Sequence, residues 1–382
     1  MRSKPNGEGL CVVMLGHKRV PGREGGVESV VEELAVRMAE QGVDVTLINR
    51  YRPGDERMAR YKGVRIRRAF TLESRSLNAV IYAFFAMLMA ACGRYDVIHV
   101  HAEGSCAMLP IAKLAQKRTV ATIHGLDWQR AKWGGFATRF LLFGERCAAK
   151  YADEVIVLSR GVQEYFRARY GRETRLIGNG VDCAVNRPAR RITEKWGLQA
   201  GGYILFLARI VPEKGLHDLL DAFAALDTDM KLVVAGDNSH ADDYFRSIRE
   251  KAAKDTRVIM TGFASGEILD ELYTNCFLYV LPSSIEGMPM TLLEAMSHGC
   301  LCLVSDIPEN TDVLDGAGLT FELGKIDSLR GALRDALASE SSETLKTAAR
   351  VRSEAFSWGA VVDQTVECYR PEATHRKRQM EG

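Results

Sequence analysis

Short apolar runs rich in β-branched residues alternate with helix-period segments along the whole 382-residue chain. The clearest helix is predicted over 27–41, where Val27, Val30, Leu34 and Met38 fall on one face. Strands that are apolar throughout and separated by such helices are typical of parallel sheets covered on both faces. The predicted strands are 10–15, 43–48, 64–67, 97–100, 119–123, 154–158 and 174–177, followed by 203–207, 231–235, 257–260, 277–281 and 301–304.

A polar segment rich in proline and arginine follows Asp182 and divides this α/β pattern into two halves. Because single hydrophobic cores stop growing beyond roughly 250–300 residues, a chain of this length predicts two domains. We expect residues 1–185 and 186–356 to form two Rossmann-like domains, with residues from about 357 to 382 returning to the first. In open sheets of this kind ligands bind beyond the carboxyl ends of the strands, so we expect a site in the cleft between the domains.

The composition excludes several classes of protein. Apolar residues make up 47% and charged residues 26%, which is typical of a soluble globular chain, and the net charge of +2 does not favour nucleic acid. The nine cysteines include no CxxC pair. Four of them, Cys11, Cys276, Cys300 and Cys302, lie in apolar runs, which indicates buried thiols in a reducing compartment and no zinc site.

A membrane surface is the less favoured explanation of two further features. Residues 77–92 are uniformly apolar but fall short of the ~20 residues that span a bilayer, so a core helix is predicted and an interfacial helix is the alternative. Basic clusters around Arg67, Arg190 and Arg376 are expected to be solvated surface, although attraction to an anionic membrane would explain them as well. No signal peptide is recognisable, and we expect a cytoplasmic protein.

Two loops at strand ends carry residues suited to phosphate. Gly25 and Gly26 precede the first helix, where backbone N–H groups favour anions, although a flexible loop explains them equally well. Arg209 and Lys214 follow the strand at 203–207 and are candidates to clamp a diphosphate, while two surface cations are the plainer interpretation. The chain lacks the GxGxxG and GxxxxGK[ST] motifs, which argues against nicotinamide, flavin and P-loop enzymes.

The most specific segment runs from Pro282 to Gly299 and contains two carboxylates, Glu286 and Glu294. Pro289 is predicted in the first turn of a helix that ends near His298. A loop carboxylate can bind sugar hydroxyls, a helical carboxylate can bind the vicinal diol of a ribose, and free N–H groups at the helix start would face a phosphate. The candidate donor-binding residues here are Gly287, Met288, Pro289, Met290 and Glu294.

Together these motifs resemble glycosyltransferase family 4. The resemblance rests on GGVE at 25–28, on the Arg209 to Gly215 loop and on Glu-x7-Glu at 286–294, with supporting motifs at 99–101, 122–125 and 178–182. It implies a retaining enzyme of the GT-B fold, with two Rossmann-like domains. Within the family the segments 15–28 and 124–133 look most like bacterial enzymes that build surface polysaccharides, including rhamnosyltransferase-like members.

The resemblance also implies roles for individual residues. Arg209 and Lys214 would neutralise the leaving diphosphate, Glu286 would bind the donor sugar, and Glu294 would bind the ribose. Gly26 would offer its N–H group to the diphosphate, and His124 would lie near the reacting sugar. Many relatives carry an aspartate directly after that histidine; here Gly125 intervenes and Asp127 comes later. The acceptor candidates are Glu28, Asp127, Trp128, Arg130 and Trp133.

The implied mechanism is front-face displacement without a protein nucleophile, in which the protein supplies position and charge. No Asp-x-Asp motif is present, so no metal and no cofactor is expected, and the donor is expected to be a nucleotide-sugar, a UDP-sugar first. The acceptor is expected to be a glycan or a lipid-linked glycan, with peripheral contact to an anionic membrane. Two other classes remain open: a sugar-nucleotide 2-epimerase of the same fold, which needs no acceptor, and a non-catalytic binding subunit of a polysaccharide assembly complex.

Overall fold

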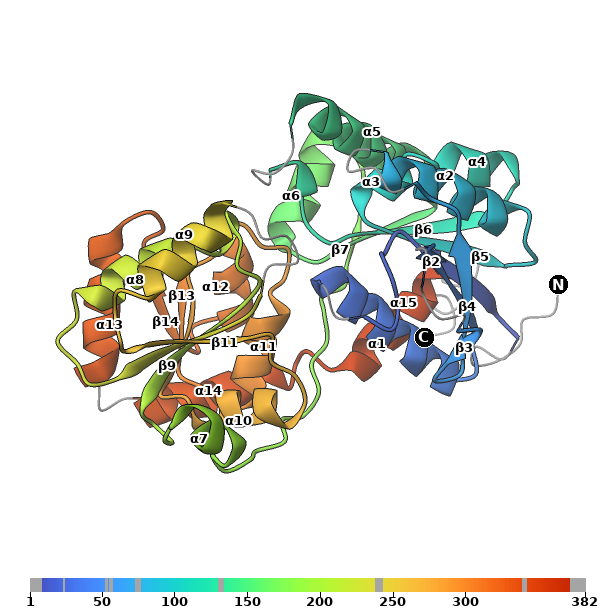
Figure 1. Ribbon diagram of the computed structural model, residues 1–382. Helices are drawn as coiled ribbons and strands as arrows, with labels where there is room; N and C mark the ends of the chain where they lie inside the picture. The colour runs from blue at the N-terminus through green and yellow to red at the C-terminus, as the bar shows by residue number, and fades with distance from the viewer. Residues whose placement is uncertain are drawn as a thin grey trace, which may run out of the picture. The chain divides into compact units, whose positions relative to one another are not determined.

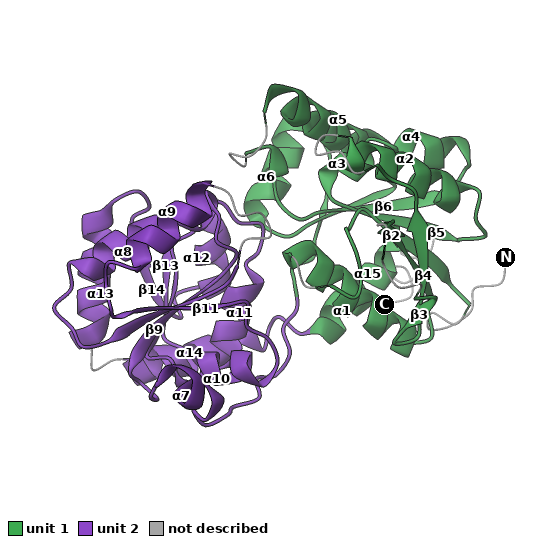
Figure 2. Ribbon diagram, viewed as in Figure 1, with its two compact units in different colours: residues 1–179, 358–382 green, residues 180–357 purple. Residues whose placement is uncertain are grey.

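The computed structural model describes residues 9–22, 25–51, 54, 58–72, 77–129, 134–237, 243–338 and 342–371. The chain forms two compact units (Figure 2). Unit 1 consists of residues 1–179 and 358–382, and unit 2 consists of residues 180–357. The first unit ends at Asn179, a few residues before the boundary at residue 185 that the polar linker predicted.

Unit 1 is built on an eight-stranded sheet in the order β3-β4-β2-β1-β5-β6-β7-β8. All neighbouring strands are parallel except β3 and β4, which form a short antiparallel edge. Strands β1, β2, β5, β6 and β7 are buried on both faces over most of their length, which explains their uninterrupted apolar runs. The strands are β1 (Cys11–Leu15), β2 (Asp44–Arg50), β3 (Arg60–Tyr61), β4 (Val64–Ala69), β5 (Val97–His101), β6 (Arg118–Ile123), β7 (Glu154–Val157) and β8 (Arg175–Leu176).

Helices cover both faces of this sheet (Figure 1). On one face α1 (Gly26–Glu40) packs against α15 (Trp358–Cys368). Among the other helices of the unit, α2 (Asn78–Ala91) packs against α3 (Glu103–Cys106) and α4 (Leu109–Leu114). Helix α5 (Gly135–Tyr151) packs against α3, α4 and α6 (Arg160–Tyr170). A short 3-10 helix, η1 (Asp127–Gln129), follows β6.

Unit 2 repeats the plan with a six-stranded parallel sheet in the order β11-β10-β9-β12-β13-β14. Its strands are β9 (Tyr203–Leu207), β10 (Lys231–Ala235), β11 (Val258–Gly262), β12 (Leu278–Leu281), β13 (Cys302–Ser305) and β14 (Leu319–Phe321). Helices α8 (Leu216–Ala224), α9 (Asp243–Ala252) and α13 (Ile326–Ala338) share one core with the sheet. The remaining elements are α7 (Arg191–Trp196), η2 (Pro212–Lys214), α10 (Glu267–Asn275), α11 (Met290–Ser297), α12 (Pro308–Leu314) and α14 (Ser342–Ser353).

The predicted fold class is confirmed: both units contain a parallel sheet covered by helices on both faces. The returning C-terminal helix is confirmed too, since α15 belongs to unit 1 and Tyr369 Oη lies 2.7 Å from His99 Nδ1. The sequence analysis missed β3 and β14, two and three residues long, because runs this short carry no detectable period. Pro289 is corrected from the first turn to the residue before the helix, which begins at Met290.

Two predictions about apolar residues need correction in part. Cys276, Cys300 and Cys302 are buried thiols as expected, but Cys11 at the start of β1 is only half-buried. Helix α2 contributes Tyr82 and Met87 to the core, while Phe84 and Phe85 on its other side are about 40% exposed. Residues 77–92 are therefore a core helix on one face only. Among the residues that the structure describes, no helix has both the length and the apolar character to cross a bilayer.

Candidate functional site

Two loops of unit 2 lie together because they leave neighbouring parallel strands. Strands β9 and β12 pair directly, so the loops that follow them begin at the same edge of the sheet. Gly215 has φ +67°, and a Cβ there would lie 2.1 Å from the carbonyl oxygen of Pro282, so only glycine permits this approach. The Ser284 N–H group also donates to the Glu213 carbonyl oxygen at 2.9 Å. The first loop is thereby fixed against the second.

This contact brings together two residues that the sequence analysis assigned separately. The Lys214 ammonium donates to Glu286 Oε1, and the two side chains are only 15% and 8% exposed. Arg209 begins the same loop and is half-buried. Its guanidinium has no hydrogen bond or ion pair with any residue that the structure describes. One loop edge therefore holds an ion pair and an additional cation.

The start of α11 lies directly beyond Glu286. Gly287, Met288 and Pro289 are buried, and the Pro289 carbonyl oxygen accepts the N–H groups of Leu292 and Leu293. Within the described ranges, the N–H groups of Met290 and Thr291 have no backbone acceptor. Because unpaired N–H groups and the helix dipole favour negative charge, this helix start suits a phosphate.

Glu294 lies on α11 and is oriented by a tyrosine that the sequence analysis missed. Tyr273 donates its hydroxyl to Glu294 Oε2 at 2.9 Å, and its ring stacks on that of His298 with centroids 5.2 Å apart. Burial raises the pKa of the Tyr273 phenol, with the nearby charge of Glu294 as the second cause, so this hydroxyl remains a donor. Tyr279 similarly donates to Thr291 Oγ1 at 2.8 Å. The sequence analysis missed both tyrosines because they lie in segments whose pattern predicted only core positions.

A second set of residues that the sequence analysis missed forms hydrogen bonds that hold the loop before Glu286. Ser305 at the end of β13 donates its hydroxyl to the Ser283 carbonyl oxygen at 2.5 Å. Asn310 donates to Ser305 Oγ at 2.9 Å, and all three residues are fully buried. The only sequence signal was a polar residue at the end of each apolar run.

In unit 1 the strand ends carry the second group of predicted residues. The loop after β1 is held by the Gly16 N–H group, which donates to Tyr82 Oη at 3.0 Å, and by Glu28 Oε1, which accepts the Lys18 N–H group at 3.0 Å. Glu28 is 7% exposed and so braces this loop, a structural task that the acceptor assignment did not anticipate. Gly25 precedes α1 in extended conformation and Gly26 is its exposed first residue.

His124 follows β6 and lies against a histidine of the neighbouring strand. His101 Nδ1 is 3.0 Å from His124 Nε2, and the rings of His99 and His101 lie 4.1 Å apart. Burial lowers the pKa of His99 to about 3 and that of His101 well below its ordinary value, with neighbouring histidines adding to the effect. His101 is therefore a neutral partner that fixes the orientation of His124.

The remaining acceptor candidates follow in η1. Asp127 and Trp128 are half-buried there, and Trp128 Nε1 donates to Glu145 Oε2 at 3.1 Å. Arg130 and Trp133 lie outside the described residues. The structure therefore groups His124, Asp127 and Trp128 at one strand end of unit 1, while Arg209, Lys214, Glu286 and Glu294 lie at one sheet edge of unit 2.

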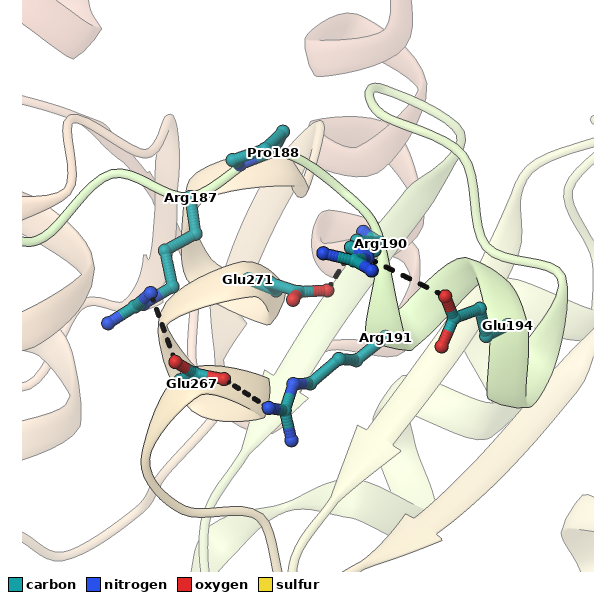
Figure 3. A pocket seen from close by; sticks show the side chains of 7 residues that line it. All are labelled: Arg187, Pro188, Arg190, Arg191, Glu194, Glu267 and Glu271. Atoms are coloured by element: carbon teal, nitrogen blue, oxygen red, sulfur yellow. Dashed lines mark hydrogen bonds and ion pairs between the residues drawn. The ribbon is translucent and has the colours of Figure 1, made fainter.

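A surface pocket of about 480 Å³ in unit 2 is a different feature. Its charged side chains point at one another in pairs (Figure 3). Arg187 lies 3.3 Å from Glu267, Arg190 lies 3.7 Å from Glu194, and Glu271 accepts the Arg190 N–H group at 3.0 Å. These contacts hold α7 against α10, so the charged residues of the pocket stabilise the packing of the two helices. It is lined by Arg187, Pro188, Arg190, Arg191, Glu194, Glu267 and Glu271.

Comparison with protein families gives two matches that follow one another along the chain. Residues 24–185 match the family model described as Glycosyltransferase Family 4, and residues 190–358 match the one described as Glycosyl transferases group 1. The first lies almost entirely in unit 1 and the second in unit 2. The resemblance to glycosyltransferase family 4 that the sequence motifs indicated is thereby confirmed.

Among curated relatives, the chain is 27% identical over 184 residues to an O-antigen chain mannosyltransferase B of Escherichia coli, covering 47% of this chain and 48% of that protein. It is 31% identical over 223 residues to YqgM of Bacillus subtilis, an uncharacterized glycosyltransferase, covering 56% of this chain and 59% of that one. The chain thus aligns with only about half of the length of each relative.

A solved structure shares the fold over most of the chain. The Anabaena protein Alr3699/HepE, in complex with UDP and glucose, superposes with a TM-score of 0.79 at 17% identity. The match covers 94% of this chain and 98% of that one. Since the two family models together span nearly all of both units, this chain belongs to glycosyltransferase family 4.

Proposed function

We propose that this protein is a retaining glycosyltransferase that moves a sugar from a nucleotide-sugar to a glycan or lipid-linked acceptor in the synthesis of a bacterial cell-surface polysaccharide. One observation carries the proposal: the Lys214–Glu286 ion pair lies on a loop edge that also holds Arg209 and the start of α11. The cations and the free N–H groups at this edge suit the diphosphate of a nucleotide-sugar, and the carboxylate suits the hydroxyls of its sugar.

The donor would be held by unit 2. Arg209 and Lys214 would bind the diphosphate, and the N–H groups at the start of α11 would bind the same phosphates. Glu286, once it shares Lys214 with the donor, would accept hydrogen bonds from sugar hydroxyls. Glu294, oriented by Tyr273, would bind the ribose diol. Ionised groups strengthen such hydrogen bonds to about 1.5–3 kcal/mol each.

In the proposed chemistry the bond between the anomeric carbon and the diphosphate oxygen breaks as the acceptor oxygen attacks the same face. The departing phosphate oxygen takes the acceptor's proton, so atoms and charge balance without a protein nucleophile. Arg209 and Lys214 would stabilise the negative charge that develops on the leaving group. Two cations at this position make a divalent metal unnecessary in the proposal.

A UDP-sugar is the proposed donor, which is supported by the UDP and glucose bound to the similar Anabaena protein. The acceptor would be bound by unit 1 near His124, Asp127 and Trp128. We place the protein in the cytoplasm, in peripheral contact with an anionic membrane. That contact is supported by the exposed Phe84 and Phe85 of α2 and by the exposed Arg67 of β4 in the same unit.

The test combines binding and transfer. In a thermal-shift panel of UDP, GDP, dTDP and their sugars, one nucleotide should raise Tm, since a ligand at 100 times its Kd stabilises by about 2.7 kcal/mol. Glu286→Ala should then abolish sugar transfer while binding of that nucleotide persists. The matched control is Lys251→Ala, which breaks the Lys251–Asp221 pair elsewhere in unit 2. Product formed from the donor alone, without an acceptor, would instead identify an epimerase.

A further inference from the structure

Glu145 is a fully buried carboxylate of α5 that gathers donors from two other elements of unit 1. Trp128 Nε1 donates to its Oε2 at 3.1 Å, and Tyr165 Oη donates to its Oε1 at 2.8 Å. The hydroxyl of Tyr170 donates to the same Oε1. Three donors on one carboxylate make Glu145 the fixed point to which η1 and α6 are attached.

A second carboxyl group, that of Glu103, is buried beside it. Glu103 is the first residue of α3 and is 0% exposed, and its carboxyl group faces the backbone of Asp127 and the side chain of Glu145. A Cβ at Gly144 would lie 2.0 Å from the Glu103 carbonyl oxygen, so α3 and α5 approach as closely as glycine allows. This approach forces the two carboxyl groups into one dry region.

Two carboxyl groups so placed cannot both carry a charge, because burial and mutual repulsion each penalise the second ionisation. Glu145 accepts hydrogen bonds from three side chains, whereas Glu103 accepts none from a side chain that the structure describes. Burial raises the pKa of Glu103 well above its ordinary value, and the charges of Asp127 and Glu145 add to this. The shared proton therefore resides on Glu103.

The other charged and titratable groups around the pair are few. Arg169 of α6 lies 4.0 Å from Glu145 Oε1 and is half-exposed. Asp127 of η1 and Cys106 of α3 face Glu103. The phenols of Tyr165 and Tyr170 have a raised pKa, first because of burial and then because of Glu145, so they keep their protons well above neutral pH. Glu103 is consequently the group that changes charge first as the pH rises.

We propose that Glu103 and Glu145 form a one-proton carboxyl pair that holds Trp128, and with it the segment after His124, in the position that receives the acceptor. They are positioning residues, because they act through Trp128. This inference rests on the proposed function only in that it names an acceptor; the pair itself is defined by its contacts. Ionisation of Glu103 would place two charges side by side, displace Glu145 and release Trp128.

The first experiment follows Trp128 fluorescence, taken as the difference between the wild-type protein and Trp128→Phe, while the pH is raised from neutral. We expect emission to shift to the red and acrylamide quenching to increase before circular dichroism shows unfolding. Glu103→Gln, which keeps the shape but cannot ionise, should abolish the transition. Glu145→Gln should abolish it too, because one carboxyl group then remains. Glu271→Gln, which alters a buried carboxylate of unit 2, is the matched control and should retain it.

The outcomes separate the pair from the proposed function. A Trp128 emission that is independent of pH up to global unfolding, or a transition that persists in Glu103→Gln, would overturn the pair. UDP binding, measured by calorimetry on the same proteins, tests the function independently and should be unaffected by either substitution. In the transfer assay, Glu145→Gln should raise the acceptor KM by about tenfold or more, the cost of one lost buried hydrogen bond, and leave the donor KM unchanged. Equal changes in both KM values would contradict a positioning role.

Discussion

Lys214 donates to Glu286 across two loops that leave the paired strands β9 and β12. Seventy-two positions separate the two residues in sequence, yet their side chains are 15% and 8% exposed and form one ion pair. A pair this buried is held by its surroundings, here by the Gly215–Pro282 approach and the Ser284–Glu213 hydrogen bond. The proposed cation for the diphosphate and the proposed carboxylate for the sugar therefore position each other.

Breaking this pair from either side should give unequal losses of stability. Lys214→Ala leaves a buried carboxylate without its cation and should lower the free energy of unfolding of unit 2 by about 3 kcal/mol. Glu286→Gln keeps a hydrogen-bond acceptor and should cost less. Urea unfolding followed by circular dichroism measures both, with Lys346→Ala in the exposed Lys346–Glu343 pair as the control. Equal effects of Lys214→Ala and the control would contradict a structural pair.

The same substitutions should separate binding from chemistry. Lys214→Ala should lower kcat by about a hundredfold or more, because removal of a group that stabilises developing charge affects the transition state most. Lys214→Arg should recover part of this loss. Calorimetric titration of the nucleotide and steady-state kinetics distinguish the two effects. A variant that loses nucleotide affinity while kcat stays unchanged would assign Lys214 to ground-state binding alone.

Glu294 should act on the ribose. Glu294→Gln should weaken UDP binding by about tenfold or more, because a hydrogen bond to an ionised group is worth about 1.5–3 kcal/mol. Tyr273→Phe, which removes the hydroxyl that orients Glu294, should weaken it less. Titration with 2′-deoxy-UDP supplies the control: because this analogue keeps only one hydroxyl of the diol, Glu294→Gln should weaken its binding less than that of UDP. Equal losses for UDP and its deoxy analogue would place the contact elsewhere on the nucleotide.

Unit 1 should lose stability in acid through its buried histidines. Burial lowers the pKa of His17 to about 4 and of His99 to about 3, and it lowers that of His101 as well. A lowered folded pKa means that between the ordinary 6.5 and about 3 the unfolded state binds protons that the folded state excludes. Stability is therefore full above 6.5 and falls as the pH drops, by at most about 1.4 kcal/mol per pH unit for each histidine.

Glu103 contributes the opposite slope, because its raised pKa makes the folded state keep a proton that the unfolded state releases above the ordinary 4.5. Glu103→Gln should therefore steepen the loss of stability between pH 6.5 and 4.5. Calorimetric unfolding across this range measures the slope for the wild-type protein and the variant. His217→Gln, at a partly exposed position of unit 2, is the control and should leave the slope unchanged.

Transfer should not require a divalent metal. Arg209 and Lys214 offer two cations at the proposed diphosphate site. Their positive charges would neutralise the diphosphate in place of a divalent metal ion. Sugar transfer should retain its rate in the presence of EDTA. Arg209→Ala should lower that rate by about a hundredfold, and added manganese should not restore it. Abolition of transfer by the chelator, with recovery on adding manganese, would show that a metal serves the leaving group.

The fold class and most of the candidate residues follow from the amino-acid sequence alone. Alternation of apolar strands with helices such as 27–41 is a local property, written in the spacing of side chains, and the structure bears it out with α1 over Gly26–Glu40. The segment from Glu286 to Glu294 was recognisable for the same reason, because both carboxylates lie within one loop and one helix.

Which side chains contact one another depends on how the elements pack in three dimensions. Strand pairing brings Lys214 to Glu286, packing of α10 on α11 brings Tyr273 to Glu294, and the close approach of α3 and α5 brings Glu103 to Glu145. None of these pairs follows from spacing, because the partners lie on different elements and their contact depends on strand order. The protonation of buried groups such as Glu103 also depends on the tertiary structure, because their pKa is set by desolvation and by neighbours that are distant in sequence.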